Sequence, residues 1–279
     1  MSIDFSKKNR IVVKVGSSTI THPQTGGLNY DKLDKLVRML CDIKNMGKDV
    51  CLVTSGAIAV GRGVLGLTEK PSSISAKQAC ASIGQASLMS VYQKLFGEYN
   101  QTIGQILMTK NTMTNEVSRN NAENTFKELF ALGAIPIVNE NDTVSTYEMQ
   151  FGDNDTLSAI VASLVGADTL ILMSDIDGLY TANPREDANA MLIPLVLKVD
   201  DSIIKMASSD TGSGVGTGGM ATKIKAAQIA SAAGTDMIIC NGEDVENLSR
   251  IFKNESVGTI FLSNKDDEFS LIDILGENA

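Results

Sequence analysis

A glycine-rich segment that ends in a lysine has the clearest chemical meaning in this sequence. The segment Gly214-Val-Gly-Thr-Gly-Gly-Met-Ala-Thr-Lys223 runs directly into a helical pattern. Exposed backbone N–H groups at the start of a helix bind anions such as phosphate, and a lysine adds positive charge. A second lysine, Lys14, stands in the first apolar run and is followed by Gly16, Ser17 and Ser18. Two lysines at two turns of small residues predict phosphoryl transfer.

Lys14 is unusual because it interrupts the apolar run from Ile11 to Val15. A lysine is normally excluded from a buried strand unless a partner neutralises it. The alternative is a lysine at the exposed end of the strand. We expect the carboxylate of Asp155 to hold the ammonium group and direct it at a phosphoryl oxygen. Lys223 alone is weaker evidence, since surface helices are rich in lysine, but its position after Gly218-Gly219 favours a function.

Two familiar glycine motifs do not explain the segment. The pattern of P-loop nucleotide-binding proteins, G-x-x-x-x-G-K-[ST], is absent. Gly214, Gly216 and Gly219 match G-x-G-x-x-G, but the residues before them do not form an apolar strand. The dinucleotide-binding motif requires that strand, so this match is weak.

Small and polar residues follow several of the predicted strands, where ligands of open α/β sheets bind. These groups are Gly16-Ser17-Ser18, Ser55-Gly56-Ala57, Asn139-Glu140-Asn141-Asp142 and Ser174-Asp175-Ile176-Asp177-Gly178. Each has a structural alternative: Ser55 could cap a helix, the Asn139 group could form an Asx turn, and Asp153-Asn154-Asp155 could cap the helix from Thr156. Their joint position at one rim of the sheet favours a site.

Short branched apolar runs alternate with longer helical patterns, which is typical of a parallel sheet with crossover helices. The predicted strands are Ile11 to Val15, Val50 to Thr54, Ile103 to Met108, Ile135 to Val138, Thr169 to Met173, Met237 to Cys240 and Thr259 to Leu262. The predicted helices are Leu33 to Ile43, Ala57 to Val64, Ala76 to Tyr99, Asn120 to Leu132, Thr156 to Val165, Met220 to Ala233 and Val245 to Phe252. We therefore expect an α/β fold with a mostly parallel open sheet sandwiched between helices.

With 279 residues and 43% hydrophobic content, the chain can bury a large core. We expect a single domain over residues 1–265. An acidic tail, residues 266–279, would fray or dock on a neighbour. Residues 143–151 are predicted to form an irregular hairpin, and residues 181–201 a surface excursion.

Charge and composition exclude several classes of function. The net charge of −9 argues against sequence-independent nucleic-acid binding. The four cysteines are widely spaced, and the only histidine, His22, stands in a polar loop, so zinc-enzyme and serine-hydrolase chemistries lose support. No apolar run is long enough to cross a membrane, and no signal peptide precedes the first strand, so we expect a cytoplasmic protein.

Six short motifs, in order, resemble the amino-acid kinase family over about Ile11 to Leu262. They are Val13-Lys-Val-Gly-Ser-Ser18, Val53-Thr-Ser-Gly-Ala-Ile-Ala-Val-Gly61, Pro136-Ile-Val-Asn-Glu-Asn-Asp142, Phe151-Gly-Asp-Asn-Asp155, Leu172-Met-Ser-Asp-Ile-Asp-Gly-Leu-Tyr180 and Gly216-Thr-Gly-Gly-Met-Ala-Thr-Lys223. The sequence is most similar to the members that phosphorylate the side-chain carboxylate of glutamate at the start of proline synthesis. Many bacterial members carry a C-terminal PUA domain, and we expect this chain to be a form without it.

The resemblance implies that the N-terminal part of the domain binds the amino acid and that the C-terminal part binds ATP. It implies that Lys14 contacts the ATP phosphates and that Ser55, Asp142 and Asn154 bind glutamate. It also places near the nucleotide Ser174, Asp175, Thr217, Gly218, Gly219, Met220, Ala221, Thr222 and Lys223. Their positions at the rim add Gly16 to the nucleotide site, and Gly56, Ala57 and Asn139 to the amino-acid site.

The expected catalytic residues are Lys14, Lys223 and Asp155. The two lysines would stabilise charge on the migrating phosphoryl group together with Mg²⁺ that accompanies ATP, and Asp155 would organise the lysines. A carboxylate acceptor is already ionised, so no general base is needed. We predict no metal ligand from the protein itself.

Two alternatives remain open. A kinase of the same fold could act on another small acid, such as acetylglutamate, aspartate, carbamate or a nucleoside monophosphate; the carboxylate of Asp142 instead suits a free ammonium group. A non-catalytic sensor could bind nucleotide or amino acid, although both lysines are present. The resemblance also suggests proline as a feedback inhibitor, with residues 143–151 as a plausible place for that control, and we expect a homo-oligomer, either a dimer or a tetramer.

Overall fold

The computed structural model describes residues 3–22, 24–145, 151, 153–184, 186–208 and 219–272. A single sheet of eight strands runs through the described part of the chain, in the order β3-β4-β2-β1-β5-β7-β8-β6. The strands are β1 (Arg10–Val15), β2 (Asp49–Thr54), β3 (Ile103–Met108), β4 (Ile135–Glu140), β5 (Thr169–Ser174), β6 (Leu195–Val196), β7 (Asp236–Asn241) and β8 (Thr259–Phe261). Among the pairings of these described strands, only that of β7 with β8 is antiparallel. The expected mostly parallel α/β sheet is therefore confirmed.

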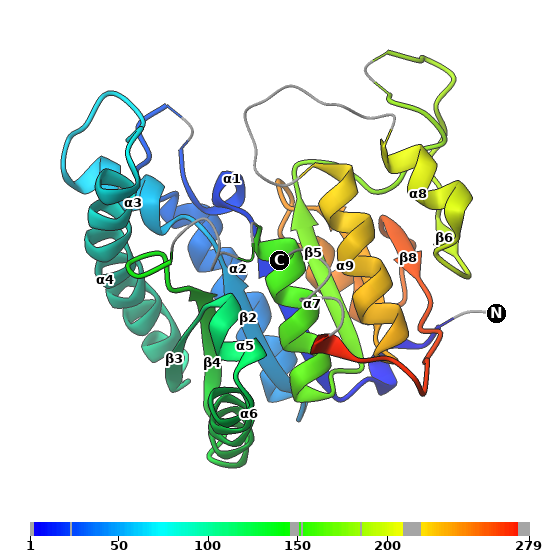
Figure 1. Cartoon of the computed structure of the whole chain (residues 1–279), viewed down its shortest axis with the longest axis horizontal. Coiled ribbons are helices and arrows are strands. Elements are labelled where there is room, and N and C mark those ends of the chain that lie inside the picture. The colour runs from blue at the N-terminus through cyan, green and yellow to red at the C-terminus, as the bar shows by residue number, and fades with distance from the viewer. Residues whose placement is uncertain are drawn as a thin grey trace.

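Helices cover both faces of the sheet (Figure 1). They are α1 (Ser17–Ile20), α2 (Tyr30–Asn45), α3 (Ala57–Val64), α4 (Ile74–Glu98), α5 (Lys110–Thr114), α6 (Glu116–Ala131), α7 (Asn154–Val165), α8 (Asp201–Ser208), α9 (Met220–Ala232) and α10 (Asn247–Phe252), with a 3₁₀ turn, η1 (Phe5–Lys7). All seven predicted helices are present; α3 has the predicted ends, and the other six have shifted ends. The short α1, α5 and α8 were not predicted.

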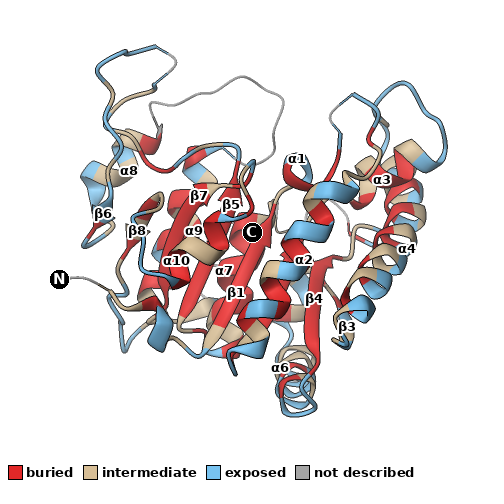
Figure 2. Ribbon diagram, turned by 180° about the vertical axis from the view of Figure 1, so that it is seen from behind, coloured by how far each residue is buried: buried red, intermediate tan, exposed pale blue. Residues whose placement is uncertain are grey.

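The alternation of side chains along each strand decides which residues face which helices. Ile11, Val13 and Val15 pack into a core with α2, α4 and α10, whereas Val12 packs into a second core with α6, α7 and α9. Both cores are buried, and the strands lie between the two helical layers (Figure 2). Because side chains alternate, Lys14 is on the face of Val12. It therefore lies on the side of the sheet that carries α7 and α9.

Several element boundaries differ from the prediction. β4 continues through Asn139 and Glu140, predicted to follow the strand, because these residues pair with Leu107 and Met108 of β3. α7 begins at Asn154 instead of Thr156, and α6 begins four positions earlier than predicted, where Asn115 caps its first turn. β8 ends at Phe261 instead of Leu262.

The predicted surface excursion over 181–201 contains the two-residue strand β6, which pairs in parallel with β8. Most of the predicted hairpin, residues 146–150, lies outside the described residues. In the described part of the acidic tail, the Asp266 N–H donates to the carbonyl of Ala232, and Phe269 and Leu271 pack against the second core. This part of the tail therefore docks on the chain's own body.

Candidate active site

Two lysines meet at one buried carboxylate. Asp155 Oδ1 lies 2.6 Å from Lys14 Nζ, and Asp155 Oδ2 lies 3.0 Å from Lys223 Nζ. Only 8% of Lys14, 3% of Lys223 and 1% of Asp155 is exposed. The predicted pairing of Lys14 with Asp155 is confirmed, and Lys223 joins it from α9. Together the three side chains carry a formal charge of +1, which suits an anionic ligand.

The environment keeps Asp155 ionised. Burial by itself raises the pKa of this carboxyl, but the neighbouring Lys14 and Lys223 hold the pKa below its usual value. The hydroxyl of Thr222 also donates a hydrogen bond to Asp155 Oδ2, at 3.1 Å. Asp155 is therefore an anchor that holds two ammonium groups at a fixed place.

The start of α7 explains why Asp155 is at this position. The side chain of Asp153 accepts hydrogen bonds from the backbone N–H of Thr156 at 2.7 Å and from its hydroxyl at 2.9 Å. Asp153 is thus the N-cap, which places Asn154 and Asp155 in the first turn of the helix. The predicted capping role belongs to Asp153, and Asn154 and Asp155 are left to face the sheet edge.

Gly16 leaves room beside the ammonium group of Lys14. A Cβ atom at this glycine would lie 3.8 Å from Lys14 Nζ and 3.6 Å from Ser18 Oγ. Gly16 is also the N-cap of α1, with no side-chain cap. The backbone at the end of β1 and the Lys14 ammonium group therefore border the same space.

A cluster of amides lies next to the lysine pair. Asn154 Nδ2 donates to the carbonyl of Thr54 and to Ser55 Oγ, both at 2.8 Å, and to Asn139 Oδ1 at 3.0 Å. The ends of β2 and β4 and the start of α7 are joined in this way. The cluster brings together Ser55, Asn139 and Asn154, as predicted. Because Asn154 and Asp155 are consecutive, it adjoins the lysine pair.

Glycines set the position of α3 against this cluster. Gly56 has φ +100°, in the left-handed region that favours glycine, and it turns the chain into α3 at Ala57. A Cβ at Gly84 of α4 would lie 1.8 Å from the Ala57 carbonyl oxygen, and one at Gly61 would lie 1.8 Å from the Cys80 carbonyl oxygen. Two backbones therefore cross in direct contact, which places the first turn of α3 at the sheet edge.

Two carboxyls follow the end of β4. Burial raises the pKa of Asp142 to about 6. Burial, opposed by a hydrogen bond from the Phe151 N–H at 2.9 Å, raises the pKa of Glu140 to about 7. No hydrogen bond joins Asp142 to Ser55 or Asn154 within the described ranges. Asp142 is half-buried and close enough to Glu140 to raise the pKa of that residue.

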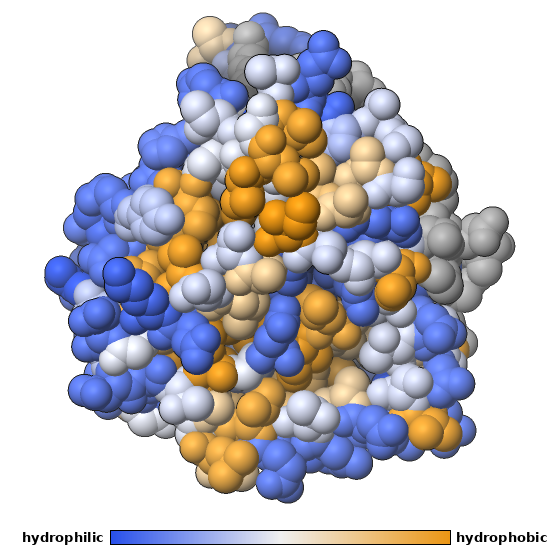
Figure 3. Space-filling view, turned by 90° about the vertical axis from the view of Figure 1, so that its left-hand side faces the viewer, coloured by the Kyte–Doolittle hydropathy of each residue, from blue (hydrophilic) through white to orange (hydrophobic). Residues whose placement is uncertain are grey.

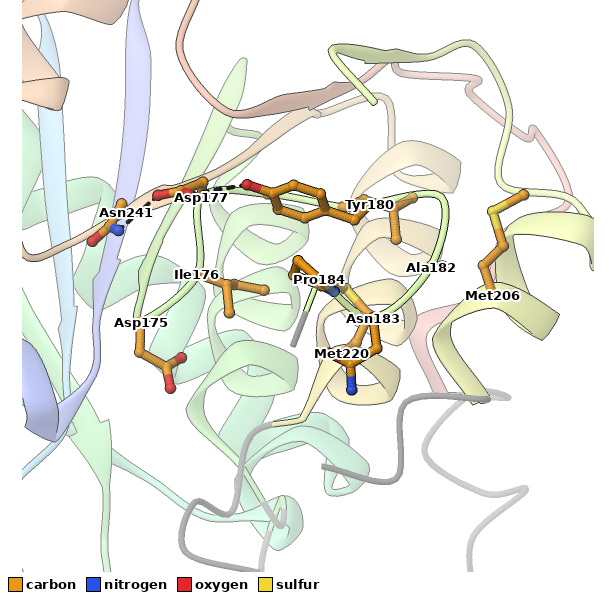
Figure 4. Close-up of a pocket in the computed structure, with 12 residues that line it drawn as sticks. Asp175, Ile176, Asp177, Tyr180, Ala182, Asn183, Pro184, Met206, Met220 and Asn241 are labelled. Carbon is orange, nitrogen blue, oxygen red and sulfur yellow. Dashed lines mark hydrogen bonds between the residues drawn. The ribbon is translucent and has the colours of Figure 1, made fainter. Parts of the chain in front are cut away.

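A pocket of about 240 Å³ lies beyond the end of β5 (Figure 4). Asp175 lines it from the position directly after β5, Asn183 and Pro184 from the segment that follows, Met206 from α8, and Met220 from the start of α9. Ser174, buried at the end of β5, donates to Asp175 Oδ1 at 3.0 Å. Tyr180 and Asn241 both donate to Asp177, which fixes the far wall. Met220, which lines this pocket, is three residues before Lys223 in α9.

The remaining predicted residues divide into two groups. Gly219 caps α9, where the Thr222 hydroxyl donates to its carbonyl, and Ala221 is exposed on the first turn. Thr217 and Gly218 lie outside the described residues.

Gln85, which was not predicted, accepts a hydrogen bond from Asn139 Nδ2 at 2.9 Å. Its sequence signal is a glutamine on the buried stripe of α4, which also holds Ala81, Leu88 and Tyr92.

A model of the amino acid kinase family matches residues 9–241. The chain belongs to the amino acid kinase family. The fold of this family agrees with two solved structures, the UMP kinases of Bacillus anthracis and Ureaplasma parvum. They have TM-scores of 0.62 and 0.63 and identities of 14% and 15%; both alignments cover 92% of this chain, and 97% and 99% of those chains. At this identity the likeness concerns the fold alone.

Curated members of the family are much more similar in sequence. The glutamate 5-kinase of Clostridium acetobutylicum is 51% identical over 92% of this chain and 96% of its own length. That of Clostridium tetani is 54% identical over 90% of this chain and 93% of its own length. That of Carboxydothermus hydrogenoformans is 50% identical over 92% of this chain and 68% of its own length.

The amino acid kinase fold positions the site at one edge of its sheet. Lys14, Ser55 and Asn139 come from the ends of parallel strands, whereas Asp155 and Lys223 come from helices on a single face. Across the described residues, no helix is both long and apolar enough to cross a membrane.

Proposed function

We propose that this chain transfers the γ-phosphoryl group of ATP to the γ-carboxylate of L-glutamate. The products are L-glutamyl 5-phosphate and ADP, and the reaction is the first step of proline biosynthesis. The observation that carries the proposal is the pair of lysines on Asp155, next to the amide cluster of Asn154. Relatives about half identical over most of the chain are glutamate 5-kinases, which supports the same acceptor here.

Glutamate would lie along the sheet edge from β1 towards β4. Neighbouring strands are about 4.8 Å apart, so β1 and β4, separated by β2, span roughly 10 Å. The reacting carboxylate would lie near Lys14 at the end of β1. The distal ammonium group would lie near Asn154 and Asp142, at the end of β4. The ionised carboxylate of Asp142 suits a free ammonium group and does not suit an acylated amine.

The chemistry needs no protein nucleophile and no general base, because the acceptor is already an anion at neutral pH. The obstacle is the approach of two anions while charge spreads over the migrating phosphoryl group. Lys14 and Lys223 would supply positive charge on both sides of that group, and Asp155 would hold them there without reorganisation. Ser55 and the amides would keep the acceptor in line.

The nucleotide would occupy the pocket beside Asp175 and Met220, with its phosphates towards Lys223. Mg²⁺ usually binds through substrate phosphates and one or two carboxylates. Both Asp155 oxygens contact ammonium groups, and both Asp177 oxygens accept hydrogen bonds from Tyr180 and Asn241. Asp175 is then the pocket carboxylate that fits such a role, although the sequence predicted no metal ligand from the protein. When bound with ATP, the ion would neutralise phosphate charge.

Cytoplasmic localisation, assembly into a dimer or tetramer and inhibition by proline belong to the same proposal. For assembly, the support is the side of the molecule formed by α3, α4 and β3, which carries several apolar areas (Figure 3). Val64, Leu65, Leu67 and Ile74 are exposed around the α3–α4 connection. Light scattering of the purified protein measures the assembly state.

The proposed reaction is tested by ADP release with Mg-ATP and a panel of acceptors: glutamate, acetylglutamate, aspartate, carbamate and UMP. Hydroxylamine should trap an acyl phosphate with glutamate only. Preference for another acid would assign a different substrate. Binding of glutamate and ATP without any acyl phosphate would instead support a sensor.

A further inference from the structure

Gln85 reaches from α4 to the proposed acceptor site. It follows Gly84, the residue whose missing side chain lets α4 touch the Ala57 carbonyl in the first turn of α3. Only 8% of Gln85 is exposed, and its Oε1 accepts a hydrogen bond from Asn139 Nδ2 at 2.9 Å. The side chain therefore lies between the start of α3 and the end of β4, at the distal end of the acceptor site.

The hydrogen bond to Gln85 decides which way two further amides face. Because the Asn139 nitrogen points to Gln85, the Asn139 oxygen faces the other way, where it accepts from Asn154 Nδ2 and from the Glu140 N–H. A primary amide nitrogen has two hydrogens. Three acceptors share the two hydrogens of Asn154 Nδ2: Asn139 Oδ1, Ser55 Oγ and the Thr54 carbonyl. The Asn154 atom left for a ligand is therefore the acceptor oxygen, Oδ1.

The nitrogen of the Gln85 amide indicates that the oxygen of this side chain matters more than the volume that the side chain fills. Gln85 Nε2 is buried and has no hydrogen-bond partner in the described part of the chain. A buried donor without an acceptor costs free energy, and a methionine would fill a similar volume without that cost. The benefit of glutamine at this position therefore lies in the acceptor Oε1.

We infer that Gln85 is a positioning residue for the acceptor amino acid. Through Asn139 it fixes the Asn154 amide so that Oδ1, a hydrogen-bond acceptor, faces the free ammonium group of the acceptor. This inference rests on the proposed phosphorylation of glutamate. In this inference, the hydrogen-bonded series Gln85–Asn139–Asn154 and the carboxylate of Asp142 together recognise the unmodified amine of the acceptor.

Steady-state kinetics of Gln85→Met test the inference. Losing one hydrogen bond that orients the site should raise KM for glutamate about tenfold, while KM for ATP and kcat change less than about threefold. Gln85→Glu keeps an oxygen that can accept from Asn139 and should recover part of the affinity. Gln93→Met is the matched control, because Gln93 is exposed on the same helix, and it should change none of these constants.

A folded Gln85→Met enzyme with wild-type KM for glutamate would overturn the inference, and so would an equal rise in both KM values. If Gln85→Met does not fold, Gln85→Asn applies the same criterion, since its amide is one methylene too short to reach Asn139. Failure of the proposed function looks different: the wild-type enzyme itself would then form no acyl phosphate from glutamate.

Discussion

Lys14 and Lys223 contact different oxygens of the same carboxylate, although one comes from the first strand and the other from a helix near the end of the chain. Lys14 reaches Asp155 because it is on the face of β1 that packs on α7 and α9. The alternation of side chains along β1 and the first turns of α7 and α9 thus bring the two ammonium groups together. Each prediction below follows from this geometry or from the site that adjoins it.

Asp155→Asn should remove the charge that holds the two lysines. Two buried ammonium groups would lose the carboxylate that lies between them, so the free energy of unfolding should fall by about 3 to 5 kcal/mol. The kcat should fall by roughly 10²-fold or more, because the lysines would no longer be preorganised. Urea unfolding and ADP release measure the two effects. Asp31→Asn is the control: its pair with Lys35 is exposed, so the stability should hardly change.

Gly84→Ala should disturb the acceptor site without touching its polar groups. Its Cβ would collide with the Ala57 carbonyl, so α3 and α4 must separate. We expect a loss of about 1 to 3 kcal/mol in stability and a higher KM for glutamate. The Cβ atom of Gly97→Ala, on the same helix, would meet nothing within 4 Å. This substitution should leave the KM for glutamate unchanged, and it should leave the stability unchanged or raise it slightly. Equal effects of the two substitutions would contradict the role of the helix crossing.

The acidity of Asp142 should appear in the pH profile. Its pKa of about 6 means that the carboxyl is largely protonated at pH 5 and can no longer attract an ammonium group. The kcat/KM for glutamate, which reports on the free enzyme, should therefore fall as the pH drops below about 6. In Asp142→Asn this limb should be absent and kcat/KM low at every pH. A limb near pH 6 that persists in the variant would belong to another group.

Glu140 should make stability depend on pH in a defined direction. Its pKa rises from 4.5 in the unfolded chain to about 7 in the fold. The stability that the protonated carboxyl contributes is fully present below pH 4.5 and is lost as the pH rises through about 7. Glu140→Gln retains an acceptor for the Phe151 N–H but does not ionise. Relative to wild type, it should gain on the order of 1 to 3 kcal/mol between pH 5 and pH 8; an equal difference at both pH values would contradict the prediction.

The sequence predicted the parts of the molecule that depend on local pattern. Seven strands were recognisable as short apolar runs, and Lys14 stood out because it was a charge inside one of them. Strand β6 was missed because two residues carry no periodicity; it exists only because β8 pairs with it. Asn139 and Glu140 appeared to follow β4, but pairing with β3 extends the strand through them.

The chemistry of the site was less accessible than the fold. Asp155 was expected to hold Lys14 and to organise both lysines, and its contacts with Lys14 and Lys223 confirm that expectation. Which carboxylate oxygen each lysine contacts depends on how α9 packs beside α7, and the sequence does not indicate it. Gln85 was missed because one glutamine on an apolar helical stripe resembles a satisfied core residue until its partner on β4 is known. Tertiary contacts of this kind connect residues far apart in the chain, and no spacing in the sequence indicates them.

A double-mutant cycle on Lys14 and Lys223 tests the central claim most directly. Acyl phosphate formation from Mg-ATP and glutamate would be measured for wild type, Lys14→Met, Lys223→Met and the double variant. If both lysines act on one phosphoryl group from one carboxylate, each single variant should lose roughly 10²-fold in kcat and the double variant far less than the product of the two losses. Losses that multiply would show that the lysines act independently, and wild-type turnover in either single variant would exclude that lysine from the reaction.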